Sequence, residues 1–391
     1  MKIHCVDTQR WLVGRADGID LADPTIIRRT KNCAEIFDCL GEQPLRLLRS
    51  PPASGKTSLA ALLANNAPSN RKVISFSALE AAGQPFENLW AKLTGVSMTD
   101  ALDHRRGPLR TYVIDEAQIL YTLGPDSPFW QLLKVINGAT TSFVQVLLLA
   151  VYGLRARRDQ LATPLEFSAV PWSLSFLALS DAEVAEFFAA FNISCSMHGC
   201  PPIPTSLQDT MQRVCGRHVG LLRRCVLLFQ DHFKGKEGVN SEDEGDFNTG
   251  SLMMLGSAGE LRALPSLVDL CTIEAEIILR VASAGSQGLT LTDTVILIFP
   301  ASLVTAGVVD LEPQHSGMVV RFSSPAMHAH ALRVVFGNRP RLSLPPNAFL
   351  SASSLVRAIV VHMMHSELCD SLSKAAFGSL FERQYQMSFF A

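Results

Sequence analysis

The sequence lacks both a long apolar run and an excess of charge of one sign. Its 391 residues carry 34 lysines and arginines against 36 aspartates and glutamates, a formal net charge of −2. Nucleic-acid-binding domains are typically basic, so any such binding would need a local patch. The most apolar stretch, residues 143–154, is shorter than the roughly 20 residues that span a bilayer. We therefore predict a buried parallel strand there and no membrane partner.

Paired cysteine motifs and a secretory signal are also absent. The nine cysteines are scattered and follow no disulfide framework, which favours a reducing compartment, cytoplasmic or nuclear. Cys195, His198 and Cys200 offer three zinc ligands, whereas a structural zinc site needs four, so we favour incidental thiols there. Residues 1–14 contain no apolar run, which argues against secretion.

The first half of the chain does contain a repeated alternation of apolar strands and helices. Strands are predicted at residues 45–49, 72–77, 110–114, 144–151 and 172–179. Helices are predicted at residues 31–40, 57–65, 85–93 and 127–137. This order predicts an α/β fold with a parallel sheet that is covered by helices on both faces.

A phosphate-binding loop (P-loop) is predicted at residues 50–57, which read SPPASGKT between a strand and a helix. A phosphate chain needs backbone N–H groups at a helix N-terminus, a mobile cation, and a hydroxyl group on Mg²⁺. Lys56 is expected to supply the cation for the β- and γ-phosphates, and Thr57 the hydroxyl.

Neighbouring residues complete this loop. Ser54 and Gly55 are expected to line the phosphates, and Gly55 lets the backbone approach them closely. Ser58 is expected to reach the α-phosphate. Ser50 stands where the motif usually has its first glycine, and the loop tolerates this change if the position keeps a negative φ.

The second half of the predicted site is the apolar strand that ends at Asp115 and Glu116. Asp115 is expected to hold the Mg²⁺ shell, and Glu116 to activate or orient the attacking water. Two acids after a strand are common by themselves. The order of P-loop, strand and acidic strand in one sheet is more specific, and it predicts a site for Mg²⁺ and ATP.

Two basic segments are further candidates for contact with the nucleotide. Ile27 is expected to pack on the base, and Arg29 to meet the phosphates or the lid, although an ordinary amphipathic segment explains both equally well. Arg155 and Arg158 are candidate γ-phosphate sensors or arginine fingers, and a solvated basic loop is the favoured alternative.

A turn with two glycines precedes a helix at residues 216–223, GRHVGLLR. His218 is a candidate donor to the β-phosphate, and Arg223 is a candidate sensor on the lid. The alternative for His218 is a capping role at the start of the helix. We favour the sensor because a lid has to contact the nucleotide from this side.

The chain is predicted to have six parts. They are an N-terminal segment (1–42), a P-loop core (43–180), a helical lid (181–233), an acidic linker (234–263), a winged-helix-like α+β unit (264–340) and a C-terminal helical segment (341–391). Asp181 is expected to cap the first lid helix. In the winged-helix-like unit, a helix is expected to start at Thr290, before two strands at 308–311 and 318–322.

Five segments carry a more specific signal. They are LRLLRSPPASGKTSLA at 45–60, VIDEAQILY at 113–121, FWQLLK at 129–134, AVYG at 150–153 and GRHVGLL at 216–222. Together they resemble the Crinkler and retrotransposon-hot-spot type proteins, which are effector-like proteins of eukaryotic microbes. The resemblance implies a STAND/AAA-like nucleoside triphosphatase module with a winged helix after the lid. It also implies a following nuclease-like domain, which we expect to be absent from this sequence, as is the Crinkler header.

The residues and the resemblance predict an enzyme, a Mg²⁺-dependent nucleoside triphosphatase that hydrolyses ATP and regulates an effector protein. The alternative is a nucleotide-binding switch and interaction module with negligible hydrolysis. The expected partners are a nucleotide, a second copy of the chain, and a host or nuclear protein. Nucleic acid as a partner and delivery into a host cell are both left open.

Overall fold

The computed structural model describes residues 4–7, 10–12, 19–51, 53–81, 84–103, 108–123, 126–139, 143–151, 172–247, 272–291, 300–305, 308–314 and 317–336. The predicted C-terminal helical segment, 341–391, lies outside these residues. The chain divides into two compact units. The first comprises residues 1–264 and 280–327, and the second comprises residues 265–279 and 328–391.

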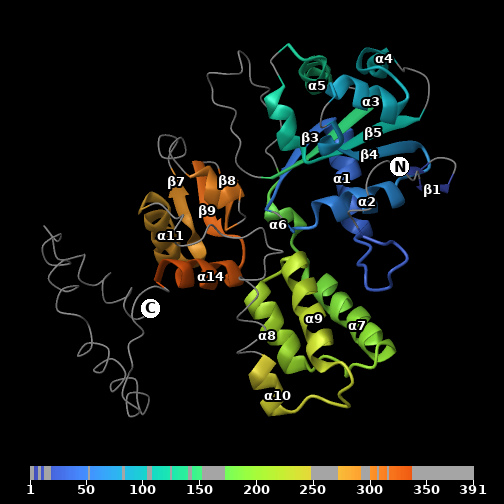
Figure 1. The fold of residues 1–391 in the computed structure, drawn as a ribbon. Coiled ribbons are helices and arrows are strands. Elements are labelled where there is room, and N and C mark those ends of the chain that lie inside the picture. The colour runs from blue at the N-terminus through green and yellow to red at the C-terminus, as the bar shows by residue number, and fades with distance from the viewer. Residues whose placement is uncertain are drawn as a thin grey trace, which may run out of the picture. The chain divides into compact units, whose positions relative to one another are not determined.

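A six-stranded sheet organises the first half of the chain (Figure 1). Its order is β1-β2-β4-β5-β6-β3, and neighbouring strands are parallel except β1 and β2. The strands are β1 (His4–Asp7), β2 (Arg10–Leu12), β3 (Leu45–Arg49), β4 (Arg71–Ser77), β5 (Leu109–Asp115) and β6 (Val144–Ala150). All seven residues of β6 are buried, which confirms the buried strand predicted from the apolar run.

The register of the sheet brings the ends of two strands together. Leu47, Leu148 and Ile114 are in line across β3, β6 and β5. The loop after β3 and Asp115 at the end of β5 therefore emerge at the same edge. In open α/β sheets this carboxyl edge is where ligands bind.

Helices cover both faces of this sheet, as predicted. They are α1 (Thr30–Glu42) and α2 (Lys56–Asn65) on one face, and α3 (Phe86–Thr94), α4 (Met98–Asp103) and α5 (Pro128–Gly138) on the other, with the short 3₁₀ helices η1 (Ala78–Ala81) and η2 (Ala117–Thr122). Alternate strand residues serve separate cores because side chains alternate across a sheet. Tyr112 packs with Trp90 in one core, whereas Val113 and Ile36 belong to the other.

The strand predicted at residues 172–179 is wrong for most of its length. Only Trp172 makes a bridge, to Leu48, and a short helix α6 (Leu174–Leu177) follows. Trp172 precedes this helix and stacks on Phe176 within it, with ring centroids 4.5 Å apart. A short apolar run by itself does not separate a strand from a buried helix.

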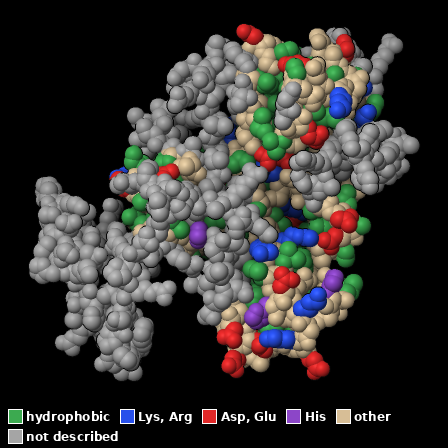
Figure 2. Space-filling model, viewed as in Figure 1, with side chains coloured by type: hydrophobic (Ala, Val, Ile, Leu, Met, Phe, Trp, Pro, Cys, Tyr) green, Lys and Arg blue, Asp and Glu red, His purple; other side chains and the backbone are tan. Residues whose placement is uncertain are grey.

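The segment predicted to be a lid, which keeps that name below, is a helical layer with its own core. Its helices are α7 (Asp181–Met197), α8 (Thr205–Cys215), α9 (Val219–Phe233) and α10 (Ser241–Asp246). The residue that caps α7 is Ser180, in a capping box with Glu183, and not Asp181 as predicted. Figure 2 shows acidic and basic side chains interspersed over these helices.

The predicted acidic linker begins as part of the lid. Asn240 caps α10 with a second capping box, and Phe247 behind it is 0% exposed. Phe247 packs against Phe229 and Phe233 of α9. The side chain of Phe247 thus connects the polar segment to the core. The sequence does not show this connection, because Phe247 is surrounded by charged residues there. Residues 248–263 lie outside the described residues.

The third part contains a three-stranded antiparallel sheet of order β7-β9-β8. Its elements are α11 (Thr272–Ala284), η5 (Gly285–Gln287), β7 (Leu289–Leu291), α13 (Ala301–Thr305), β8 (Val309–Gln314), β9 (Gly317–Phe322) and α14 (Pro325–Phe336). The hairpin of β8 and β9 after a helix gives the winged-helix-like order that was predicted. Thr290 lies in β7, so the helix predicted from Thr290 does not begin at that residue. Residues 292–299 lie outside the described residues, and α13 covers the end of the predicted helix. Among the described helices, none combines the length and apolarity that a bilayer span requires.

Candidate nucleotide site

The loop between β3 and α2 has the backbone of a phosphate-binding loop. Gly55 has φ 95° and Ala53 has φ 60°, both in the left-handed region. Left-handed residues beside right-handed ones let successive N–H groups face one anion, here at the N-terminus of α2. Ser50 is not among the residues with positive φ, which is the condition under which it can replace glycine.

Ser50 and Ser54 close the base of this loop. Their hydroxyl oxygens are 2.6 Å apart, and the two residues are 0% and 1% exposed. The Ser50 N–H donates to the carbonyl of Ala150, at the end of β6, over 3.1 Å. The hydroxyl of Ser50, which glycine would lack, therefore adds a hydrogen bond to Ser54 across the loop. Ser58 lies half-buried in the first turn of α2.

Lys56 is the cation inside the loop. Its Nζ donates to the carbonyl oxygens of Ser50 and Pro51, each over 2.8 Å, and the residue is 6% exposed. A phosphate oxygen is a stronger acceptor than a neutral carbonyl, so this ammonium group can turn from the carbonyls to a phosphate.

Thr57 and Asp115 meet at the edge of the sheet. The Thr57 hydroxyl donates to Oδ2 of Asp115 over 2.6 Å. Burial raises the pKa of Asp115, against the lowering effect of hydrogen bonds from Thr57 and the Glu116 N–H. A buried carboxylate beside a hydroxyl offers the hard oxygen atoms that Mg²⁺ prefers. The residues present therefore fit Mg²⁺.

Glu116 leaves β5 in a left-handed conformation, with φ 52°. Such a φ is uncommon outside glycine and points to a residue whose placement is constrained by its surroundings. Its N–H donates to Oδ1 of Asp115 over 2.9 Å, so the two predicted acids are held side by side.

The start of α9 lies directly against the loop. A Cβ atom on Gly220 would be 2.1 Å from the carbonyl oxygen of Ala53, and one on Gly55 would be 3.0 Å from Cγ1 of Val219. Only glycine at position 220 allows the lid backbone to come this close. Gly220, the second glycine of the GRHVGLL segment, thus allows the lid to contact the phosphate-binding loop.

His218 caps α9, the alternative role considered for it. Its Nδ1 accepts from the Leu221 N–H over 3.3 Å, so the ring proton of the neutral form is on Nε2. Burial, with a smaller contribution from the charge of Lys56, lowers the pKa of His218 to about 4. The ring is therefore an uncharged donor near neutral pH. Its role as a phosphate sensor remains a prediction.

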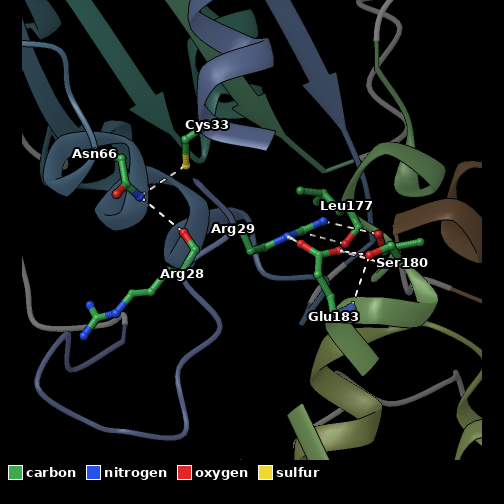
Figure 3. A network of polar contacts seen from close by, with 8 residues as sticks. Arg28, Arg29, Cys33, Asn66, Leu177, Ser180 and Glu183 are labelled. Carbon is green, nitrogen blue, oxygen red and sulfur yellow. Dashed lines mark hydrogen bonds and ion pairs between the residues drawn. The ribbon is translucent and has the colours of Figure 1, made fainter. Parts of the chain in front are cut away.

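Arg29 and Ile27 both contact the lid, and Figure 3 shows Arg29 directed at Glu183. The Arg29 Nε lies 3.1 Å from Oε1 of Glu183, and its other guanidinium nitrogens donate to the carbonyls of Leu177 and Ala178. Of the two roles expected for Arg29, the structure shows the one at the lid. Ile27, expected to pack on a base, is buried in the lid core because its apolar side chain finds aromatic partners there.

Arg223 likewise faces the N-terminal segment. Its guanidinium lies 3.1 Å from Oδ2 of Asp23, and the sensor role expected for Arg223 remains a prediction. Although burial opposes it, hydrogen bonds from Thr25 and Arg223 lower the pKa of Asp23. Arg155 and Arg158 lie outside the described residues.

The loop, the strand order and the acidic end of β5 are those of P-loop nucleoside triphosphatases, and the chain has that fold. No family model and no curated protein matches it. Among solved structures, a Walker-type ATPase of Pyrococcus abyssi is 13% identical with a TM-score of 0.45, covering 78% of this chain and 96% of that one. The Drosophila ORC bound to DNA is 11% identical with a TM-score of 0.38, covering 80% and 99%.

A third similar structure is the Aeropyrum pernix Orc1 protein in complex with DNA. It is 14% identical with a TM-score of 0.38, and the match covers 82% of this chain and 95% of that one. These similarities are remote, so the fold and the site rest on the geometry of this chain. The resemblance to Crinkler proteins has no support among these matches.

Gln118 is a residue at this site that the sequence analysis did not single out. Its side-chain amide donates to the carboxylate of Glu116, and its Oε1 accepts from the Val151 N–H over 3.1 Å. The only signal in the sequence was its position two residues after Glu116. An amide two residues beyond a strand end is too common to mark a site by itself.

Proposed function

We propose that the chain is a Mg²⁺-dependent nucleoside triphosphatase with ATP as its substrate. The observation that carries this proposal is the cluster at one edge of the sheet, where Lys56 lies inside the loop and Thr57 contacts Asp115. A cation, a hydroxyl and a carboxylate at this edge are the parts that phosphoryl transfer needs.

In the proposed reaction, water attacks the γ-phosphorus while the bond to the β–γ bridging oxygen breaks. Lys56 stabilises charge on the β- and γ-phosphates, and Glu116 accepts the proton of the water. Thr57 and Asp115 would hold Mg²⁺, which when bound neutralises charge on the phosphate oxygens. The N–H groups at Ser54 and Gly55 are proposed to orient the phosphates.

The contact between lid and loop supports a second candidate, a nucleotide-binding switch with negligible hydrolysis. Gly220 lies so close to the carbonyl of Ala53 that a change in the loop on nucleotide binding would displace the start of α9. We also propose that such a displacement of α9 regulates an effector domain, which is the role that the resemblance to Crinkler proteins implies.

The test compares wild type with Glu116→Gln and Lys56→Ala in phosphate release and in calorimetric titration with Mg-ATP. Glu116→Gln keeps the size of the side chain but cannot accept the proton, so affinity is retained and turnover falls about 10²–10⁴-fold. Lys56→Ala is expected to lose affinity with its circular dichroism unchanged. Lys92→Ala, an exposed lysine on α3, is the matched control and behaves as wild type.

Two outcomes would count against this assignment. Unchanged affinity in Lys56→Ala would overturn the nucleotide site. Equal single-turnover rates in wild type and Glu116→Gln would remove the catalytic role of Glu116 and favour the switch.

A further inference from the structure

Gln118 connects the end of β5 to the end of β6 through both ends of its amide. The amide nitrogen donates to Oε2 of Glu116, and the amide oxygen accepts from the Val151 N–H over 3.1 Å. A donor faces a carboxylate and an acceptor faces an N–H, so the orientation of the amide is fixed by its two partners. Gln118 itself is half-buried in η2.

The second partner of Gln118 is a rigid one. Val151 directly follows β6, the strand that lies between β3 and β5 and is buried along its whole length. A hydrogen bond to this backbone fixes Gln118 to the carboxyl end of a buried strand. It does not depend on a mobile surface side chain.

The first partner of Gln118 is the carboxylate of Glu116, whose orientation matters for its proposed role as a general base. Glu116 lies on a turn with φ 52°, and its flexible side chain has several rotamers available there. A general base has to lie within hydrogen-bond reach of the proton that it accepts. Gln118 engages Oε2, so Oε1 is the oxygen that we assign to the water.

We infer that Gln118 is a positioning residue, which holds the Glu116 carboxylate toward the attacking water by anchoring it to the end of β6. This inference rests on the proposed hydrolase function. In this proposal Gln118 acts through Glu116 and not on the nucleotide, so its effect is expected in kcat and not in KM. Misplacing a reacting group by about 1 Å costs up to about 10²-fold in rate.

The experiment is a double-mutant cycle on the full chain, with ATP hydrolysis measured for wild type, Gln118→Ala, Glu116→Gln and the double variant. Gln118→Ala should lower kcat by about tenfold to hundredfold with KM unchanged. In the Glu116→Gln background the same substitution should have no further effect, because Gln118 acts through Glu116. Gln131→Ala, an exposed glutamine on α5, is the control.

Gln118→Glu tests the hydrogen bond to Glu116 while keeping the one to Val151. It takes the place of Gln118→Ala if that variant does not fold. A carboxylate still accepts from the Val151 N–H, but it repels Glu116 instead of donating to it. The inference requires a loss of kcat in Gln118→Glu as large as that in Gln118→Ala. Wild-type kcat in Gln118→Glu, or equal losses from Gln118→Ala in both backgrounds, would overturn it.

The same measurements distinguish failure of the inference from failure of the proposed function. A wild-type protein that binds ATP without turnover would overturn both. Turnover in wild type, with Gln118→Ala indistinguishable from it in kcat, would overturn the inference alone.

Discussion

Ala53 carries backbone strain in the phosphate-binding loop. Its φ of 60° is unfavourable for a residue other than glycine by about 1–2 kcal/mol. Glycine removes this strain but adds about 0.5–1 kcal/mol of backbone entropy cost. Ala53→Gly is therefore expected to raise the free energy of unfolding by about 0.5–1 kcal/mol, measured by urea denaturation.

Ala189, exposed in the middle of α7, is the matched control for this exchange. There the backbone is helical, so Ala189→Gly should lower the free energy of unfolding by about 0.5–1 kcal/mol. Opposite signs at the two positions are the expected result. The same loss at both would show that Ala53 carries no strain.

Residues of the site were predictable where the signal is local. The spacing of Lys56 and Thr57, and the acids at a strand end, predicted a cluster that the register of the sheet does bring together. The partners of Arg29 and Arg223 lie 154 and 200 positions away in the sequence. A guanidinium shows no local pattern that names its acid, so the sequence predicted neither ion pair.

At the level of elements, strands with a buried apolar pattern were predicted to within a residue or two, as β3 and β6 show. Predictions failed where an apolar run is short or where a single apolar residue stands among polar ones. Residues 172–179 are too short a run to separate strand from helix, and Phe247 is a lone aromatic in an acidic segment. In both cases tertiary packing decides the structure.

The contact of α9 with the loop gives a prediction at the same level. In Gly220→Ala the added Cβ would lie 2.1 Å from the Ala53 carbonyl oxygen, so the helix start has to move away. Such overpacking is expected to lower the free energy of unfolding by about 1–3 kcal/mol in urea denaturation.

Gly41 in α1 provides the control for Gly220→Ala. A Cβ atom on Gly41 would meet nothing within 4 Å, so Gly41→Ala should raise the free energy of unfolding by about 0.5–1 kcal/mol. If Gly220→Ala also gains stability, the lid backbone does not lie against the loop.

On the scale of the whole molecule, the predicted P-loop core and lid are parts of one compact unit. The N-terminal segment joins them, because Arg29 pairs with Glu183 of α7 and Asp23 pairs with Arg223 of α9. No single segment of the sequence signals this arrangement. It follows from ion pairs between the N-terminal segment and two helices that lie far from it in the chain.

The pH dependence of the free energy of unfolding should report on His218, which is buried at the start of α9. The pKa of His218 is about 4 in the folded protein, lowered mainly by burial from an ordinary value of 6.5. Between these values the unfolded chain binds a proton that the folded protein does not. The contribution of His218 to stability is therefore complete above about pH 6.5, and it falls as the pH falls toward 4.

The expected loss is about 3 kcal/mol, at 1.36 kcal/mol for each pKa unit. His218→Asn is the comparison, because asparagine can cap α9 but does not titrate. Urea denaturation from pH 7 to pH 4 should show wild type losing about 3 kcal/mol more than His218→Asn. Carboxylates titrate in both proteins and cancel in the difference. Parallel pH profiles would mean that His218 is not held neutral between the lid and Lys56.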